Sequence, residues 1–466
     1  MVAINRREFL KMMAAVSATS VLPLSCSSGN KQKPNIVFIL TDDQGWTQLG
    51  CYGSKYYETP NINRLAEQGM RFTNAYAACP VCSPTRASIM TGKYPARLHL
   101  TDFIKGGKPP AGSKLQHPQW SKYLPLEEIT IAEVLKQSGY ATGFFGKYHL
   151  SQEKMPPESL PFNPDKQGFD ESFVTYKPSR SMAQEWQTPE NDGHNVEIIT
   201  QKSLQFIEDH QKKPFFLYVS HNTIHNPLME KKTLIKKYKN KLGSDLPENN
   251  PLIGAMLETL DKSVGRITKK LDALNLSDNT IVIFFSDNGG LEKEADQTPL
   301  RSGKASLYEG GIRVPLIVKW NGKVEANTLT DEIVCSVDFF PTLIKAAGIT
   351  KKYENIDGVN LLPTLIRDQK LSRETIYWHY PHYHSAGEGP CGAIRSGDYK
   401  LIEWFDKSIN GIQTEGALEF YNLKEDVGEQ KNLIKDMPEL AAKLYKKLSD
   451  WRKNVGAQEM EKNNQQ

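Results

Sequence analysis

The sequence predicts an α/β protein with a large, mixed but mostly parallel central sheet flanked by helices, and a smaller C-terminal antiparallel sheet closed by a helix. Two observations support this fold class. Short apolar runs, typical of parallel strands buried on both faces, recur up to residue 320. Longer segments with apolar residues at spacings of three and four lie between them and predict helices that cover the sheet.

The individual elements follow from these patterns. Strands of the central sheet are predicted at 35–41, 141–145, 214–220, 280–286 and 314–320. Helices are predicted at 130–138, 197–211, 251–274, 337–347 and 438–454. Shorter strands separated by turns are predicted at 375–379, 392–396, 400–404 and 419–422. Residues 34–374 are therefore expected to form an N-terminal α/β domain, and residues 375–466 a C-terminal α+β subdomain that ends in a polar tail.

Residues 1–25 are predicted to be an export signal. Arg6 and Arg7 precede an apolar stretch too short to span a bilayer comfortably, and the order Arg-Arg-x-Phe-Leu-Lys resembles a twin-arginine signal. Residues 22–26 resemble a lipobox with an atypical Pro23, so we expect a lipid-anchored Cys26 followed by a tether at 26–33. The protein is then expected in the periplasm or cell envelope. An amphipathic first helix of the domain is the alternative.

Composition excludes several classes of partner. The formal net charge is +4, which gives no reason to expect binding to nucleic acid, and membrane contact is expected only through the lipid anchor. The six cysteines fit neither a metal-ligand spacing nor a disulfide-dense scaffold. One or two disulfides remain possible in an exported protein, and the sequence leaves their connectivity open.

Acidic and amide side chains follow two of the predicted strands directly. Asp42 and Asp43 come after the first strand, and Asp287 and Asn288 come after the strand at 280–286. Ligand sites of open α/β sheets lie at the carboxyl ends of the strands, and oxygen-rich clusters suit a hard cation. The alternative is that these residues only cap turns.

Basic side chains follow two further strands and a glycine-rich loop. Lys147 and His149 follow the strand at 141–145, and in an extended segment they point to the same face. His221 and His225 follow the strand at 214–220, and Lys304 lies in the loop before the strand at 314–320. A single histidine after a strand is more often a hydrogen-bonded loop residue. Four predicted strands, however, are each followed by aspartate, lysine or histidine, and this pattern indicates a site.

The segment Cys82-Ser83-Pro84-Thr85-Arg86 predicts an anion site. Pro84 suits the first turn of a helix that Gly92 would end. Cys82 would lie at the helix N-terminus, where the backbone dipole favours negative charge, with Arg86 one turn further on. A buried cysteine followed by an ordinary helix is the alternative.

Residues 80–92 resemble the signature of the type I, formylglycine-dependent sulfatases, with Thr85 in place of the usual serine. The segments 146–149 and 304–315 also resemble sulfatase motifs. The loop at 221–227 departs from its motif, with Ile224 where the family usually has proline, and the choice of His225 over His221 rests on the following Asn226-Pro227. The chain is thus similar to the exported carbohydrate sulfatases of bacteria, which belong to the alkaline-phosphatase-like superfamily.

This resemblance implies a site and its cofactors. Cys82 would be oxidised to formylglycine by a formylglycine-generating or anaerobic sulfatase-maturating enzyme and would act as the nucleophile. Arg86 would assist it, Lys147 would orient the sulfate, His149 would take a proton, and His225 and Lys304 would support the departing oxygen. The resemblance implies one calcium ion and the following ligands for it: Asp42, Asp43, Cys82, Asp287 and Asn288.

The implied activity is hydrolysis of sulfuric esters on a carbohydrate, most simply in an exo-acting manner. We expect a preference for 4-O-sulfated galactose or N-acetylgalactosamine. The residues expected to bind the sugar are His382, His384, Glu388 and Arg395. Two alternatives stay open: a phosphate or phosphonate monoester hydrolase of the same superfamily, and a non-catalytic lipoprotein that binds sulfated glycans.

Overall fold

The computed structural model describes residues 33–151, 161–176, 194–409 and 412–463. The predicted export signal and nearly all of the tether lie outside these residues. Within the described part of the chain, no helix is both long and apolar enough to cross a membrane.

The central sheet has eight strands in the order β10-β2-β9-β8-β1-β7-β5-β6. Their bounds are β1 Asn35–Thr41, β2 Met70–Phe72, β5 Ala141–Gly146, β6 Glu171–Val174, β7 Phe215–Ser220, β8 Thr280–Ser286, β9 Leu316–Lys319 and β10 Thr328–Thr330. Only β9 runs antiparallel to its neighbours β8 and β2. The predicted mixed, mostly parallel sheet is therefore confirmed.

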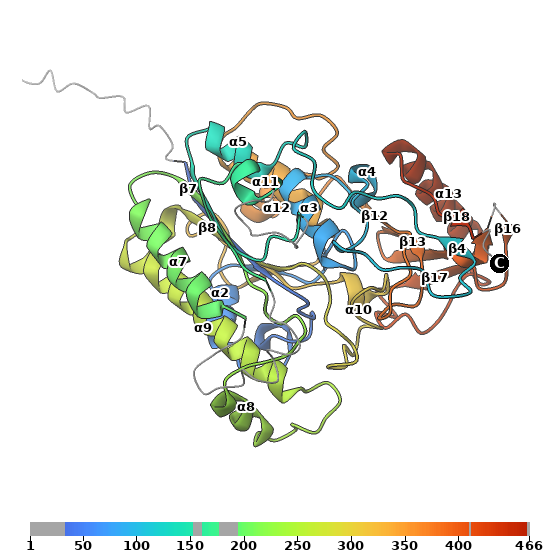
Figure 1. The fold of residues 1–466 in the computed structure, drawn as a ribbon, viewed down its shortest axis with the longest axis horizontal. Helices are drawn as coiled ribbons and strands as arrows, with labels where there is room; N and C mark the ends of the chain where they lie inside the picture. Colours follow the sequence, from blue (N-terminus) through green and yellow to red (C-terminus); the bar gives the residue numbers. More distant parts are fainter. Residues whose placement is uncertain (1–32, 152–160, 177–193, 410–411, 464–466) are drawn as a thin grey trace, which may run out of the picture. The chain divides into compact units, whose positions relative to one another are not determined.

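Helices cover both faces of this sheet (Figure 1). In β1, Ile36 and Phe38 point to one face and Val37 to the other, as the alternation of a strand requires. The first face is covered by α3 Cys82–Thr91, α5 Ile131–Gln137, α11 Phe339–Ala346 and α12 Leu362–Arg367. The second face is covered by α2 Pro60–Glu67, α7 Val196–Asp209 and α9 Pro251–Ala273, with α8 Lys232–Lys239 packed on α9. The sequence analysis predicted α3, α5, α7, α9 and α11, in full or in part. It did not predict α2, α8 or α12.

A second sheet of four antiparallel strands follows, as predicted. Its order is β12 Thr375–Tyr380, β13 Cys391–Ser396, β14 Tyr399–Trp404 and β17 Leu418–Asn422. Helix α13, Pro438–Val455, packs against this sheet and ends at Gly456, which takes the left-handed conformation. The shorter elements are β3 Ala75–Tyr76, α4 Pro95–Leu98, β4 Leu115–Gln116, α10 Glu309–Ile312, β11 Val334–Cys335, β15 Ser408–Ile409, β16 Ile412–Gln413 and β18 Glu461–Lys462.

Part of the predicted polar tail is ordered. Strand β18 pairs antiparallel with β4, and the backbone N–H of Asn463 donates to the carbonyl of Lys114. This pairing joins residues more than 340 positions apart in the sequence, and a search for local patterns cannot detect it.

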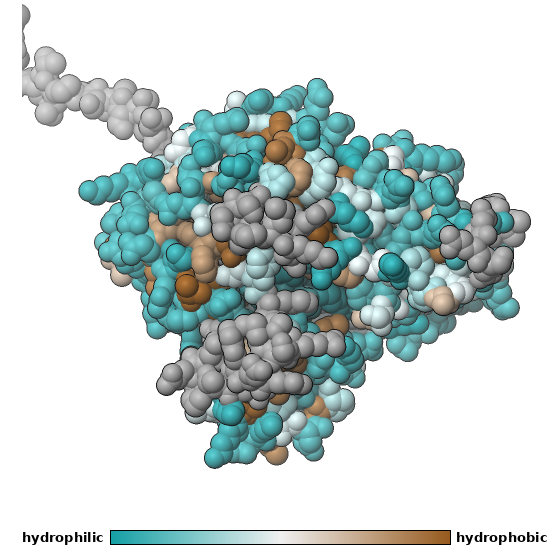
Figure 2. Space-filling model, viewed as in Figure 1, coloured by the Kyte–Doolittle hydropathy of each residue, from teal (hydrophilic) through white to brown (hydrophobic). Residues whose placement is uncertain are grey.

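A buried ion-pair network joins the second sheet to the rest of the protein. Lys400 in β14 is fully buried, and its Nζ lies 2.9 Å from Glu309 Oε1 and 2.8 Å from Glu429 Oε1. Tyr76 donates its hydroxyl hydrogen to Glu309 Oε2 at 2.6 Å. The described residues from Pro34 onward accordingly form one compact unit. The face seen in Figure 2 is mostly hydrophilic, with apolar residues in small, separate groups.

Candidate active site

The carboxyl ends of four neighbouring parallel strands carry the predicted site residues. In the order β8-β1-β7-β5, these ends lead directly into Asp287, Asp42, His221 and Lys147. Because parallel strands end at the same edge of the sheet, side chains from distant parts of the sequence meet there. Helix α3 delivers Cys82 and Arg86 to the same edge.

Arg86 is the central cation of this edge. All ten residues of α3 are buried, and the helix ends at Gly92 with φ 71°. The Arg86 guanidinium donates through Nε and Nη2 to Asp287 Oδ2, at 2.9 and 2.7 Å. Its Nη1 donates to the Lys147 carbonyl at 2.8 Å and to Ser220 Oγ at 2.7 Å. One side chain thus links α3 to β8, β7 and the segment after β5.

Two lysines neutralise the adjacent aspartates. Lys147 Nζ lies 2.9 and 2.8 Å from the two carboxylate oxygens of Asp42. Lys304 Nζ lies 2.5 Å from Asp43 Oδ1, which also accepts a hydrogen bond from Asn288 Nδ2 at 2.9 Å. Asp43 has a φ of 60°, a conformation that aspartate tolerates better than most residues.

The electrostatics of the acidic cluster fit a bound cation. Burial alone would raise the pKa of Asp42, but the positive charges led by Lys147 hold it well below its usual range. Burial and the negative charge of Asp42 raise the pKa of Asp287 well above its usual range, despite the contact with Arg86. A bound cation would add positive charge next to Asp287 and favour its ionised form.

Two buried oxygens of the same cluster remain available to a ligand. Asp43 Oδ2 and Asn288 Oδ1 have no hydrogen-bond partner among the described residues. Ligand atoms of Asp42, Cys82 and Asp287 lie within 4.8 Å of one another, as do those of Asp42, Asp43 and His225. An oxygen-rich set of this kind suits a hard cation such as calcium.

His149 is oriented toward Cys82. Its Nδ1 lies 3.2 Å from the Cys82 Sγ, and its Nε2 lies 2.7 Å from the carbonyl oxygen of Ile104. A carbonyl only accepts hydrogen bonds, so Nε2 carries the proton in the neutral ring, and Nδ1 presents its lone pair to Cys82. This geometry suits a group that accepts a proton at the position of the Cys82 sulfur.

His225 and Lys304 lie beside Asp43. His225 Nε2 is 3.8 Å from Asp43 Oδ2, and Nδ1 donates to the Asn226 carbonyl at 2.5 Å. Burial, reinforced by the charge of Lys304, lowers the pKa of His225 to about 3. His221, in contrast, is fully buried outside the pocket, with Nε2 3.2 Å from Ser263 Oγ.

The residues of this edge open into a pocket of about 430 Å³. Six predicted site residues line it: Asp43, Cys82, Lys147, His149, His225 and Lys304. Lys105, Tyr176, Asn222 and Lys293 also line it and were not singled out from the sequence. The strand-end rule could have indicated Asn222, which follows β7, whereas Tyr176 follows β6, a strand that the sequence analysis did not predict. Lys105 and Lys293 lie in loops without a recognisable pattern.

Of the four residues predicted to bind the sugar, only His384 lines the pocket. The prediction is wrong for His382, whose side chain is fully buried with Nε2 2.8 Å from Thr101 Oγ1. It is also wrong for Arg395, which is 4% exposed and donates to Asn74 Oδ1 and to the Tyr76 hydroxyl. Glu388 is exposed but lies outside the lining, and its Oε1 accepts a hydrogen bond from Ser302 Oγ at 2.6 Å.

The five cysteines among the described residues are all free, so none of them forms a disulfide.

Comparison with known proteins identifies the family. Residues 34–349 match the sulfatase family, and residues 302–454 match the family described as N-sulphoglucosamine sulphohydrolase, C-terminal. A sulfatase of Formosa agariphila is 30% identical over 514 residues, covering 92% of this chain and 91% of the relative. The N-acetylgalactosamine-6-sulfatase of Homo sapiens is 32% identical over 384 residues, covering 76% of this chain and 69% of the relative.

Solved structures show the same relationship over nearly the whole chain. The crystal structure of Ps i-CgsB superimposes with a TM-score of 0.74 at 29% identity, covering 90% of this chain and 93% of that one. The same protein has been solved in complex with k-i-k-neocarrahexaose. Because the family match covers more than half of the chain and agrees with the fold, this protein belongs to the sulfatase family, with its alkaline-phosphatase-like fold, and is a sulfuric ester hydrolase.

Proposed function

We propose that this sulfatase removes O-sulfate from a carbohydrate and that the sulfated sugar at a chain end enters the pocket. The observation that carries the proposal is one pocket of about 430 Å³, which places Cys82, Lys147, His149, His225 and Lys304 around one volume. Pockets of this size bury most of a small ligand. Removal of sulfate from the terminal sugar of a chain corresponds to the expected exo action.

The sugar is proposed to be galactose or N-acetylgalactosamine. The human relative is named for N-acetylgalactosamine, and Ps i-CgsB was solved with a neocarrahexaose, which supports this choice. The relative is named for position 6, whereas the sequence led us to expect position 4. The 4-O position stays a prediction, and both positions have to be compared directly.

We further propose that the site uses formylglycine made from Cys82 and one calcium ion. Hydrated formylglycine supplies two hydroxyl groups on one carbon, one as nucleophile and one through which the group can be regenerated, which a thiol cannot do. Calcium supplies positive charge for the sulfate oxygens. The proposed ligands are Asp42, Asp43, Asp287, Asn288 and the modified Cys82 side chain. The maturing enzyme is of the formylglycine-generating or anaerobic sulfatase-maturating kind.

The protein's own residues then have distinct roles. His149 Nδ1 accepts a proton at the position of the Cys82 side chain, since Nε2 is fixed as a donor to Ile104. Lys147 and Lys304 bind the sulfate oxygens, because both residues line the pocket. Lys304 and His225 support the departing oxygen, Lys304 as the charged donor.

The alanine variant of Cys82 tests the proposed nucleophile. Cys82→Ala, compared with the wild type after coexpression with a maturing enzyme, should lose at least about a thousand-fold in kcat on an aryl sulfate. Its Tm should change by less than about 4 °C, because removing one small buried group has a modest effect on stability. Cys391→Ala, equally buried in β13 and outside the lining, is the matched control and should keep its activity.

Retained turnover in Cys82→Ala, with mass spectrometry of the wild-type protein showing only the thiol, would contradict the proposal. A matching aryl phosphate assayed beside the sulfate distinguishes the phosphatase alternative, which requires the phosphate to be the better substrate.

Calcium is expected to stabilise the protein. After treatment with a chelator, a hundredfold excess of calcium over its Kd should add about 2.7 kcal/mol to the free energy of unfolding. Asp43→Asn should reduce this gain, because the site loses a negative charge and Asp43 Oδ2 is one of its unpartnered oxygens. Asp245→Asn, an exposed site, is the control. Thermal unfolding measures the effect, and a calcium response that is equal in both variants would exclude Asp43 as a ligand.

His384 is expected to contribute to recognition of the sugar. His384→Ala should lower kcat/KM on the preferred sulfated sugar about ten-fold, which corresponds to about 1.4 kcal/mol, or one polar contact. Turnover of a small aryl sulfate should be nearly normal, because that substrate does not extend to His384. Glu388→Ala, outside the lining, is the control. Equal losses on both substrates would instead assign His384 to the catalytic centre.

The substrate panel for this experiment consists of galactose and N-acetylgalactosamine, each sulfated at position 4 or 6, with sulfated glucosamine and fucose. A preference for glucosamine or fucose would overturn the proposed sugar.

We also propose that the protein is an exported lipoprotein anchored through Cys26. The support is the sequence of residues 1–26 alone. Cys26→Ser should move the protein from the membrane fraction to the soluble fraction of the cell envelope. Cys51→Ala is the control, and an unchanged distribution would argue against the anchor.

A further inference from the structure

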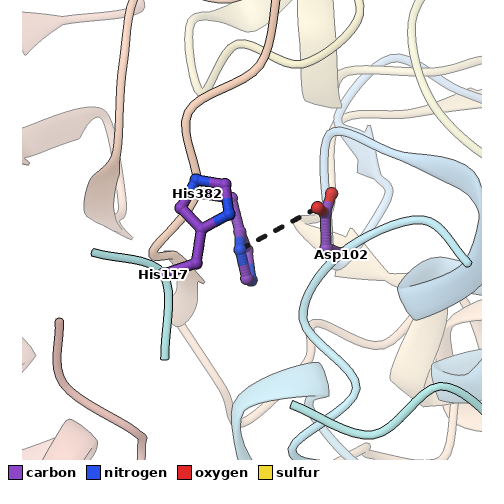
Figure 3. Close-up of side chains that lie close together, drawn as sticks. All are labelled: Asp102, His117 and His382. Atoms are coloured by element: carbon purple, nitrogen blue, oxygen red, sulfur yellow. Dashed lines mark ion pairs between the residues drawn. The ribbon is translucent and has the colours of Figure 1, made fainter. Parts of the chain in front are cut away.

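We propose that Asp102, His117 and His382 form a second metal site, for zinc or a similar divalent transition metal, separate from the acidic cluster of the active site. One ligand atom from each residue lies within 4.8 Å of the other two. Figure 3 shows the His382 ring facing the Asp102 carboxylate, with the His117 ring next to His382. Nothing in the proposed hydrolysis of sulfate esters uses these three residues.

Three distant segments supply the site. Asp102 lies in the loop after α4, His117 follows β4 directly, and His382 follows β12. Asp102 and His382 are fully buried, while His117 is partly exposed and lines a surface pocket of about 830 Å³. An ion could therefore reach the site from the His117 side.

His382 is the residue that most clearly points to a ligand. Its Nε2 lies 2.8 Å from Thr101 Oγ1, a contact that can hold the ring in place and accept its proton. Its Nδ1 is directed at Asp102 Oδ2 at 3.9 Å, too far for a hydrogen bond, and has no partner among the described residues. Metal-binding histidines in proteins commonly donate their other ring N–H in this way.

Asp102 is oriented so that one oxygen stays available. Oδ1 accepts hydrogen bonds from the Phe103 amide at 2.9 Å and the Tyr380 hydroxyl at 3.2 Å. Oδ2, the oxygen nearer to His382, accepts one long bond of 3.3 Å from the Gly107 amide. The carboxylate is thus fixed through one oxygen and has a lone pair to offer through the other.

His117 links the site to the active-site pocket. Its Nε2 accepts a hydrogen bond from the Tyr383 amide at 2.8 Å, so a metal ion bound to this ring has to replace that bond. Tyr383 precedes His384, which lines the active-site pocket. Burial lowers the pKa of His117 to about 4 and that of His382 well below its usual range, so both rings are neutral at neutral pH.

The donor set selects the class of metal. Two imidazoles and a carboxylate are typical zinc ligands, with a fourth position open to water, whereas calcium prefers sites made of oxygen atoms. Burial raises the pKa of Asp102 to about 6, and the nearby charge of Lys122, which offsets part of that rise, opposes a bound cation. Lys122 is held over the Trp120 ring, with Nζ 3.0 Å from the ring centroid.

The test uses the full chain without an affinity tag, saturated with calcium, and zinc as the only added probe. Isothermal titration should show one bound zinc per chain, accompanied by a rise in Tm. His117→Gln and His382→Gln should each weaken zinc binding at least ten-fold. His99→Gln, an exposed histidine outside the cluster, should bind zinc as the wild type does. Because His382 is fully buried, His117→Gln decides the matter if the His382 variant does not fold.

Lys122→Gln provides an independent check, since removing its positive charge should tighten zinc binding at least two-fold. Three results would overturn the proposal: no zinc uptake by the calcium-saturated protein, unchanged zinc binding in His117→Gln, or displacement of the zinc by further calcium. The last result would place the zinc in the acidic cluster instead.

Discussion

The buried contact between Arg86 and Asp287 holds the active-site edge of the sheet together. The guanidinium donates two hydrogen bonds to one carboxylate oxygen at the end of β8, and it uses its remaining nitrogen for Lys147 and Ser220. Arginine suits this position because its planar group donates in several directions at once and stays charged when buried. Removing either partner of a buried pair typically costs about 3–5 kcal/mol, because the other charge is left without compensation.

The same contact determines where the chemistry takes place. Since Arg86 lies one turn after Cys82 on α3, the position of the guanidinium fixes the start of the helix and therefore the Cys82 side chain. Lys147 then compensates Asp42, and Lys304 compensates Asp43, so each of the two adjacent aspartates is paired with one lysine. The same edge of the sheet keeps two buried oxygens, Asp43 Oδ2 and Asn288 Oδ1, that have no hydrogen-bond partner in the described part of the chain.

The fold and the central part of the site could be predicted because both depend on local patterns. The strands at 35–41 and 280–286 have the predicted bounds, since each is a continuous apolar run followed by acidic residues. Strands β2 and β10 were missed because three-residue strands leave no periodic signal and owe their existence to pairing partners far away in the sequence.

The sugar-binding residues were harder to predict. The segment around His382 is rich in aromatic and polar side chains, but the sequence does not tell which of them point inward. His382 is buried behind Thr101, and Arg395 is buried in β13 beside Tyr76, so neither can contact a sugar. The cluster of Asp102, His117 and His382 could not be recognised either, because its members come from three segments that only the folded chain brings together.

The burial of α3 also sets an order of events in the making of this protein. Cys82 is 1% exposed, and every residue that follows it in the helix is covered by the rest of the fold. A small substrate can enter the pocket, but an enzyme that has to bind the chain on both sides of the thiol finds those residues inaccessible. If Cys82 is converted to formylglycine as proposed, the conversion has to take place before α3 packs against the sheet, and a chain that folds first retains its thiol.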